Sequence, residues 1–315
     1  MRMTLSCASS FLVLLGKFIY CVGMQLRMVT LVISLSVSFL GCCLAIIEQT
    51  NQQDQSPRWQ KSLLHPTRGI VVVAHGLNLK PSAMDDLCTA LNMRGFHTYR
   101  VSLTGHDTRH EDVFPASRWS EDFAASYRSA QSMDLTLPTY IVAFSAGGLV
   151  ATHFLDSMPA EVKPPHKMVL LAPALALRLL PRSAYLLTWV WPLKLAVRNL
   201  APESYRRLDY TPLFWYRNTI ELYDETRELA HVDRLQKIPT LILLSRDDEL
   251  ISRTILSEWL EHNHLVKTWR VEQVRPEPKT GNLYQHLIID ENSLGETQWR
   301  DTTARIAAFL REPEY

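Results

Sequence analysis

Ser145 is the residue with the clearest capacity for chemistry, because it follows the β-branched and aromatic run Tyr140–Phe144 and precedes small residues. A run of this kind that ends at a serine and then becomes compatible with a helix is typical of a strained turn that exposes the serine hydroxyl. The pattern is A-x-S-x-G, with Ala143 where such turns usually carry glycine. Taken alone, it is equally compatible with a strand that enters a helix through an ordinary serine cap. The other groups that a nucleophilic serine requires must therefore decide between these readings.

A nucleophilic serine needs a histidine that accepts its proton and a carboxylate that orients the histidine. The apolar run Leu241–Ser245 opens directly into the letters RDDE. We predict Asp248 as the acid, and its neighbours Asp247 and Glu249 are the alternatives. The preceding strand pattern ends in Leu170-Leu-Ala-Pro173 and offers no carboxylate at its exit.

His286 lies after the last strand pattern and before the last helix pattern, which suits an order of serine, acid and histidine along the chain. His262 and His264 also follow the acid, but they fall at a helix end before the last strand. Among the histidines that precede the acid, His106, His110 and His153 are most simply explained as surface or core residues. We therefore predict that His286 is the base for Ser145.

The first central strand pattern ends in His75-Gly76-Leu77, and a His-Gly pair at such an exit lets the backbone turn sharply. We expect the backbone N–H groups of Leu77 and Ala146 to form an oxyanion hole for the substrate oxygen. Main-chain donors suit this role because they are rigid, and the loss of one such donor typically costs about 100- to 1000-fold in rate.

The elements that must position these residues alternate between strand and helix patterns, which predicts an α/β fold with a mostly parallel central sheet flanked by helices. The expected strands are Gly69–Ala74, Thr98–Leu103, Thr139–Phe144, Lys167–Leu171, Thr240–Ser245 and Lys267–Val274. The expected helices are one capped by Ser82 and ended by Gly95, one around Ser120–Ser132, one from the serine turn to about Leu155, and one from about Glu296 to Arg311.

Residues 173–232 interrupt the alternation, since they carry many aromatic and leucine side chains among arginines and show no strand pattern. We expect an inserted helical lid there, with core segments at residues 67–172 and 233–315. An inserted lid over a pocket needs an apolar underside, although these aromatic side chains are also explained as the lid's own core.

Residues 1–48 are predicted to be a membrane anchor or a signal peptide, because residues 28–47 carry no charge over about the length that spans a bilayer. The letters FLGC that end at Cys42 are similar to a bacterial lipobox, in which the cysteine is lipidated. Arg27 before the apolar run places the rest of the chain outside the cytoplasm by the positive-inside rule. The glutamine-rich residues 49–66 suit a polar tether to a membrane-associated domain.

The composition limits the other partners of the chain. The 33 basic and 32 acidic residues are interspersed, with a net charge of +1 and no Lys/Arg block, so we expect no nucleic-acid binding. Cys88 is the one cysteine outside the N-terminal segment, which excludes an internal disulfide framework or a cysteine metal site for the domain. No spacing of histidines and carboxylates indicates another metal site, and no cofactor is expected.

Together, the His-Gly strand exit, the serine turn, the RDDE loop and the late histidine resemble the α/β-hydrolase superfamily. Within it, the chain is similar to the monoacylglycerol lipases, lysophospholipases and carboxylesterases grouped as serine aminopeptidase-like hydrolases. The resemblance runs from about Thr67 to the C-terminus. It includes Gly105-His106-Asp107, similar to the family's GHG loop with Asp107 in place of glycine, and the downstream Trp119. It implies an eight-stranded sheet, a helical lid between strands, no cofactor, and ester hydrolysis through an acyl-enzyme.

These observations predict a membrane-associated serine ester hydrolase acting on a lipophilic ester, such as a monoacylglycerol or lysophospholipid. One alternative is an aminopeptidase-type amide hydrolase on the same three residues, and another is a catalytically silent binding protein of the same fold. An aminopeptidase needs a carboxylate for the substrate amine, and five in the expected lid show no convincing pattern: Glu203, Asp209, Glu221, Asp224 and Glu225. The intact serine, acid and histidine positions argue against the silent protein.

Overall fold

The computed structural model describes residues 58–107, 113–178, 196–199, 201–277 and 285–313. The expected anchor at residues 1–48, the lipobox cysteine Cys42 and His110 lie outside these ranges. Within the described ranges, no helix combines the length and the apolar character that a membrane crossing requires.

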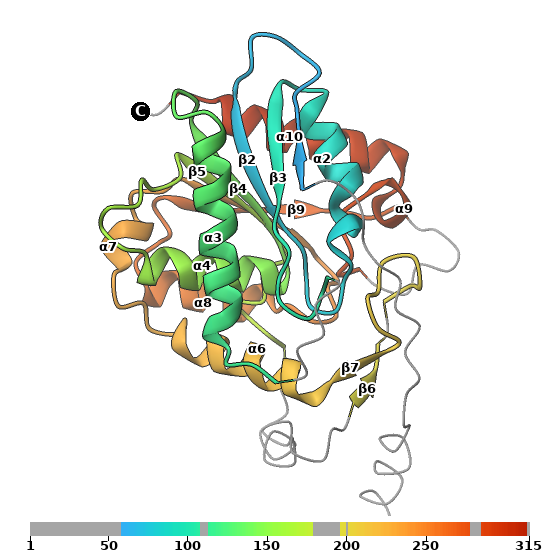
Figure 1. Ribbon diagram of the computed structural model, residues 1–315. Helices are drawn as coiled ribbons and strands as arrows, with labels where there is room; N and C mark the ends of the chain where they lie inside the picture. The colour runs from blue at the N-terminus through green and yellow to red at the C-terminus, as the bar shows by residue number, and fades with distance from the viewer. Residues whose placement is uncertain (1–57, 108–112, 179–195, 200, 278–284, 314–315) are drawn as a thin grey trace, which may run out of the picture.

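A central sheet of seven strands, in the order β1-β3-β2-β4-β5-β8-β9, organises the described residues (Figure 1). All neighbouring pairs are parallel except β1 with β3. Every residue of β2, β4, β5 and β8 is buried, as expected for parallel strands covered on both faces. The predicted mostly parallel α/β fold is therefore confirmed. The strands are β1 Trp59–Gln60, β2 Gly69–Ala74, β3 Phe96–Arg100, β4 Thr139–Phe144, β5 Lys167–Leu171, β8 Thr240–Ser245 and β9 Trp269–Val274.

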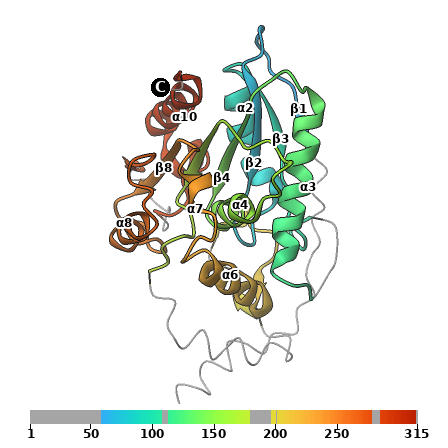
Figure 2. The ribbon, with the colours of Figure 1, turned by 90° about the vertical axis from the view of Figure 1, so that its left-hand side faces the viewer.

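Helices cover both faces of the sheet (Figures 1 and 2). The connections from β2 to β3 and from β3 to β4 run in opposite directions across the sheet, so right-handed crossovers place α2 and α3 on opposite faces. The helix α4 packs beside α3, and α10 packs beside α2. The helices are η1 Pro81–Met84, α2 Asp85–Asn92, α3 Ser117–Met133, α4 Ala146–Ser157, α6 Leu213–Glu225, α7 Val232–Leu235, α8 Arg253–His262, α9 Glu291–Leu294 and α10 Glu296–Arg311.

Three predicted elements differ from the structure in their bounds. The strand expected at Thr98–Leu103 is β3, Phe96–Arg100. Ser82 does not cap a helix but lies within the 3₁₀ turn η1, and α2 begins at Asp85 without a side-chain cap. The strand β9 begins at Trp269 rather than Lys267, because the backbone N–H groups of Thr268 and Trp269 still donate to the carbonyl of Leu265. The turn at Leu265 thus extends two residues further than expected, and the strand begins after it.

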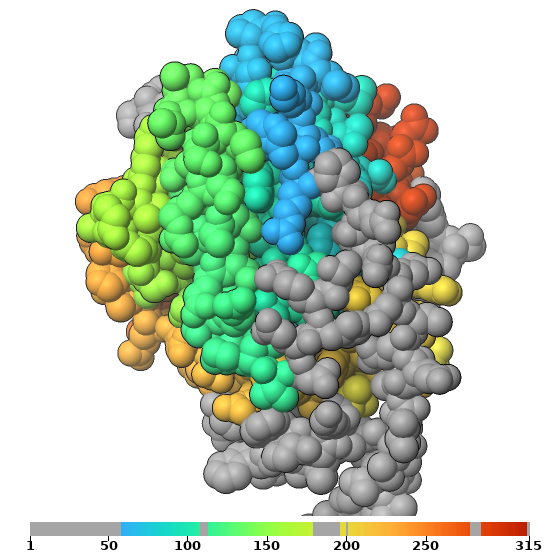
Figure 3. Space-filling view, viewed as in Figure 1, coloured from blue at the N-terminus to red at the C-terminus, as the bar shows by residue number. Residues whose placement is uncertain are grey.

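The predicted tether at residues 49–66 is wrong in its last part, because β1 joins the sheet antiparallel to β3. Trp59 packs edge-on against His97, and Arg100 donates its N–H to the carbonyl of Arg58 at 2.7 Å. Arg58 therefore lies beside the carboxyl end of β3. Figure 3 shows these first described residues, in blue, on the same surface as the green helix α3. Even with β1 included, the sheet of the described residues has seven strands and not the eight that the resemblance implied.

The described residues 196–235, which connect β5 to β8, are called the crossover segment below. The expectation that this region lacks strands is wrong, because β6 (Ala196–Arg198) pairs antiparallel with β7 (Tyr210–Pro212). Strands of three residues show too little alternation to be seen in a sequence. Helix α6 of this segment packs against α4 (Figure 2), the helix that follows Ser145.

Candidate active site

Ser145 joins β4 to α4 in a strained backbone conformation, with φ 51° and ψ −118°. The backbone around it is held by hydrogen bonds on both sides. Its N–H donates to Leu171 at the end of β5, and its carbonyl accepts from Gly148 and Ala174, all at 2.9 to 3.0 Å. A non-glycine residue persists in such a conformation only when its surroundings impose it, and such strain is concentrated at functional sites.

The small residues around the serine turn are not equally demanding. A Cβ added to Gly147 would lie 2.4 Å from the carbonyl oxygen of His75, so only glycine fits there. Ala143, in contrast, is an ordinary buried strand residue whose register partner in β2 is Ala74. The departure from G-x-S-x-G thus falls at the tolerant position of the turn.

Ser145, His286 and Asp248 form one hydrogen-bonded row. The imidazole Nε2 of His286 lies 2.9 Å from Ser145 Oγ, and its Nδ1 lies 2.9 Å from Asp248 Oδ2. Because an ionised carboxylate only accepts, Nδ1 carries the proton and Nε2 is available to accept from the serine hydroxyl. The imidazole and the carboxylate are buried, whereas Ser145 is partly exposed. This arrangement can deprotonate the serine while it shields the base and the acid from water.

The three adjacent carboxylates of the RDDE loop have different surroundings. Asp248 also accepts the N–H groups of Leu250 and Ile251 on its second oxygen, at 2.8 and 2.7 Å. Asp247 is exposed. Glu249 accepts the backbone N–H groups of Gln285 and His286, at 2.9 and 3.1 Å. Glu249 thus holds the loop that carries the imidazole, a role that its place in the sequence did not reveal.

The other histidines considered in the sequence have different surroundings. His153 bonds Ser120 and Glu225, at 2.7 and 2.8 Å, and His262 and His264 lie at the end of α8. His106 is fully buried, and burial in the first place, then its neighbour His75, holds its pKa well below the usual range. It is the core histidine that the sequence suggested, with contacts described further below.

The two expected oxyanion donors come from two elements, the start of α4 and the loop that follows β2. Ala146 is the first residue of α4, so its N–H has no acceptor within the helix and lies at the positive end of the helix dipole. The carbonyl of Gly76 is bonded to His75 Nδ1 at 2.9 Å and accepts from the N–H of Leu79 at 3.3 Å. Since a trans peptide is planar, the N–H of Leu77 points away from these two groups.

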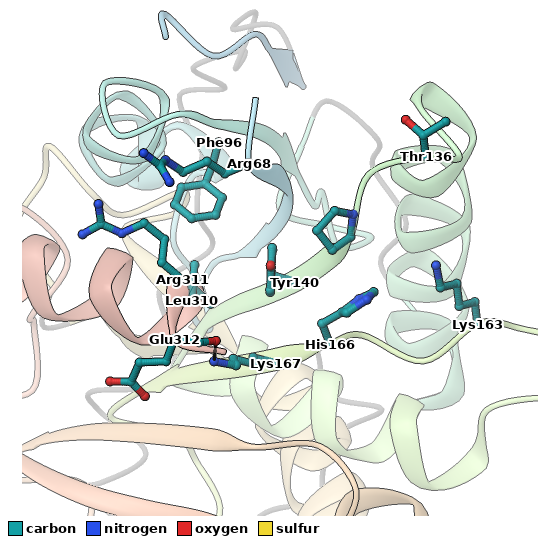
Figure 4. Close-up of a pocket in the computed structure, with 11 residues that line it drawn as sticks. Arg68, Phe96, Thr136, Tyr140, Lys163, His166, Lys167, Leu310, Arg311 and Glu312 are labelled. Atoms are coloured by element: carbon teal, nitrogen blue, oxygen red, sulfur yellow. Dashed lines mark hydrogen bonds between the residues drawn. The ribbon is translucent and has the colours of Figure 1, made fainter. Parts of the chain in front are cut away.

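A separate hollow of about 590 Å³ lies at the opposite edge of the sheet (Figure 4). Its walls come from the amino ends of β4 and β5 and the end of α10, and include Tyr140, Lys167 and Arg311. Ser145 lies at the carboxyl end of β4, so this hollow does not belong to the same site. Among the residues that the structure describes, no cluster of histidine, cysteine and carboxylate side chains could hold a metal ion.

Comparison with solved structures shows the same fold elsewhere. A structure from work on LipS and LipT, two metagenome-derived lipolytic enzymes, matches with 19% identity and a TM-score of 0.56 over 82% of this chain and 99% of that one. A soluble variant of monoglyceride lipase from Saccharomyces cerevisiae matches with 11% identity and a TM-score of 0.60 over 84% and 95%. A monoacylglycerol lipase from Paleococcus ferrophilus matches with 17% identity and a TM-score of 0.57 over 84% and 98%. No curated protein sequence matches the chain.

The model of one protein family matches residues 65–271, which is more than half of the 315 residues. The matched range includes the His-Gly strand exit, the serine turn and the acidic loop, and it ends before His286. The chain therefore belongs to the family described as serine aminopeptidase, S33, and has the α/β-hydrolase fold.

Proposed function

We propose that this protein is a serine ester hydrolase in which Ser145, His286 and Asp248 form the catalytic triad. The observation that carries the proposal is the unbroken row of hydrogen bonds from the serine hydroxyl to the buried carboxylate. The strained turn that presents the hydroxyl supports it independently.

In the proposed mechanism His286 Nε2 takes the proton of Ser145 as Oγ attacks the ester carbonyl carbon. The N–H groups of Leu77 and Ala146 stabilise the oxyanion, and Asp248 stabilises the imidazolium. The imidazolium then protonates the leaving alkoxide, which departs as the alcohol. Water attacks the acyl-enzyme with His286 again as base, and the acid leaves as Ser145 regains its proton.

The substrate class that we propose is a lipophilic ester, such as a monoacylglycerol or lysophospholipid. The likeness to structures of a monoglyceride lipase and a monoacylglycerol lipase supports this. In the crossover segment, α6 buries Phe214 and Trp215 in an aromatic cluster with Phe114, His106 and Trp119, as the core of a lid would. We propose that this segment is part of a lid formed by residues 173–232. The apolar residues 28–47 support a membrane association of the same protein outside the cytoplasm, by an anchor or through a lipidated Cys42.

A fluorophosphonate probe tests the nucleophile. Wild-type protein should be labelled, and Ser145→Ala should not. Labelling that persists in Ser145→Ala would show that another residue is the nucleophile.

The substrate class is tested with p-nitrophenyl esters from acetyl to decanoyl and with monoacylglycerol, where rates should rise with acyl length. Rates that stay flat, together with no release from monoacylglycerol, contradict a lipophilic substrate.

The family description keeps a second candidate, an aminopeptidase-type amide hydrolase on the same triad. Such an enzyme needs a carboxylate for the substrate amine, and three of the five considered carboxylates already have a side-chain partner. Asp209 pairs with Arg206 at 2.6 Å, and Glu225 bonds His153 at 2.8 Å. Glu221 lies 3.9 Å from Arg217. We therefore favour the ester hydrolase, and parallel assays with aminoacyl-coumarins and fatty-acyl esters separate the two activities.

A further inference from the structure

Asn78 follows the proposed oxyanion donor Leu77 and is itself in the left-handed conformation, with φ 53°. It is 1% exposed, and its backbone and side-chain polar groups are all hydrogen-bonded. A buried asparagine with this backbone, directly beside a proposed catalytic amide, fixes the path of the loop at the point where its direction matters.

The side-chain amide of Asn78 binds the crossover segment as a backbone peptide would. Its Oδ1 accepts the N–H of Leu208 at 2.9 Å, while its Nδ2 donates to the Leu208 carbonyl at 3.1 Å and to Thr211 Oγ1 at 2.7 Å. The backbones of the two segments continue this contact. The carbonyl of Asn78 accepts the N–H of Arg207 at 2.9 Å, and Lys80 donates to the carbonyl of Tyr205 at 2.8 Å.

The backbone N–H of Asn78 is held by a second clamp. It donates to Nε2 of the buried His106 at 2.8 Å, so the imidazole proton lies on Nδ1, which faces the carbonyl of Thr104 at 3.3 Å. The ring of His106 stacks on Trp215 of α6, with centroids 4.3 Å apart and an interplanar angle of 23°. Both clamps on Asn78 therefore contact the crossover segment.

The N–H of Leu77 belongs to the peptide between Gly76 and Leu77, and Asn78 follows immediately. His75 holds the carbonyl of that peptide, and His106 holds the next N–H. The direction of the Leu77 N–H is thus set by neighbours on both sides. On the Asn78 side, every side-chain contact leads to Leu208 or Thr211.

We propose that Asn78 is a positioning residue through which the crossover segment aims the oxyanion amide of Leu77. The crossover segment then governs the rate of the chemical step, in addition to any role in covering the substrate. This inference rests on the proposed hydrolase function.

The variant Asn78→Gly removes the side-chain clamp but keeps a residue that adopts positive φ without strain. We expect kcat to fall about 10- to 100-fold with KM changed less than about twofold, because complete loss of one oxyanion donor costs about 100- to 1000-fold. Asn92→Gly is the matched control. Asn92 is also a buried asparagine, and its amide bonds Phe96 and Thr98 near the opposite edge of the sheet. The Asn92→Gly variant should have a lower Tm than wild type and an unchanged kcat.

Thr211→Val removes one partner of Asn78 from the crossover side and is the milder variant. It should lower kcat about three- to tenfold. In the double variant with Asn78→Gly, kcat should equal that of Asn78→Gly alone, since both changes break one network. Independent, multiplicative effects would overturn the inference, as would an Asn78→Gly variant with unchanged kcat and only a lowered Tm.

Hydrogen exchange supplies a readout that does not depend on activity. In both variants, the amides of Asn78 and Leu79, which are hydrogen-bonded to His106 and Gly76, should exchange at least tenfold faster than in wild type, and those of β5 should not change. Unchanged exchange at Asn78 and Leu79 overturns the inference even if the wild type hydrolyses no ester. A wild type without activity and with faster exchange in the variants overturns the proposed function but not the mechanical coupling.

Discussion

Neighbouring side chains with the same chemistry take different positions in this molecule, and the RDDE loop shows why. All three carboxylates follow the same buried strand, and the sequence predicts Asp248 as the acid with Asp247 and Glu249 as alternatives. Which of three adjacent carboxylates faces His286 is decided by the turn after β8, where Leu250 and Ile251 donate to Asp248. Turn geometry leaves no periodic trace, so the bonds of Glu249 to a loop 36 and 37 residues away could not be foreseen.

Asp248→Asn tests the proposed acid, and Asp247→Asn is its matched control. We expect kcat to fall about 1000- to 10 000-fold in Asp248→Asn, because an amide no longer favours the imidazole tautomer that accepts the serine proton. The exposed Asp247→Asn should stay within about twofold of wild type. Equal losses in the two variants would contradict the assignment of the acid.

His106 predicts how stability depends on pH. Burial, and then the positive charge that His75 and Arg207 bring nearby, keep its folded-state pKa well below the ordinary value of 6.5. In the unfolded chain, His106 therefore binds a proton at about pH 6.5, whereas in the folded chain it stays neutral. The free energy of unfolding consequently falls as the pH drops from about 7 toward 5. Urea unfolding should show this slope reduced in His106→Gln, whose side-chain oxygen can still accept the N–H of Asn78. The exposed His231→Gln should keep the wild-type slope.

At the scale of elements, the predicted bounds are correct for the fully buried strands, whereas the short strands β1, β6 and β7 were not predicted. The bounds of β2, β4, β5 and β8 agree with the expected ranges, because continuous apolar runs between turn residues leave little choice. The edge strand β1 and the strands β6 and β7 have only two or three residues each, and the partner of β1, the strand β3, lies far along the chain. Such short elements depend on tertiary contacts that no local pattern records.

The serine turn gives a pair of substitutions with opposite expectations. Ala143→Gly restores G-x-S-x-G, yet we expect no gain in activity and a loss of about 0.5–1 kcal/mol in unfolding free energy, because glycine weakens a strand. Gly147→Ala should abolish activity or prevent folding, since its Cβ would clash with the His75 carbonyl. Thermal unfolding and ester hydrolysis measured on both variants check this. A higher activity of Ala143→Gly than of wild type would contradict the expectation that alanine is tolerated at this position of the turn.

For the whole molecule, the alternation of strand and helix patterns predicts the mostly parallel sheet, and the motifs at the strand ends predict the α/β-hydrolase fold. The strand order and the path of the crossover segment have no such local signal, because the path depends on polar contacts such as those of Asn78 and Arg207 with residues 133 and 100 positions away. We expect a protein of residues 58–315 to keep the proposed esterase activity, since the proposed triad and its supports lie within this range. Its activity against a short-chain ester, compared with that of the full chain, measures this.

The antiparallel strand β1 has a consequence for how the enzyme would meet its surroundings. Because the chain enters the domain at Arg58, beside the carboxyl end of β3, everything N-terminal to it is attached on the same edge of the sheet as Ser145. Attachment on the opposite edge, near the loop between β1 and β2, would have turned the serine away from the site of anchoring. The proposed membrane association of residues 28–47 would therefore join the domain on the side that carries Ser145. For the proposed lipophilic ester, the serine would then lie at the end of the domain to which the anchor is attached.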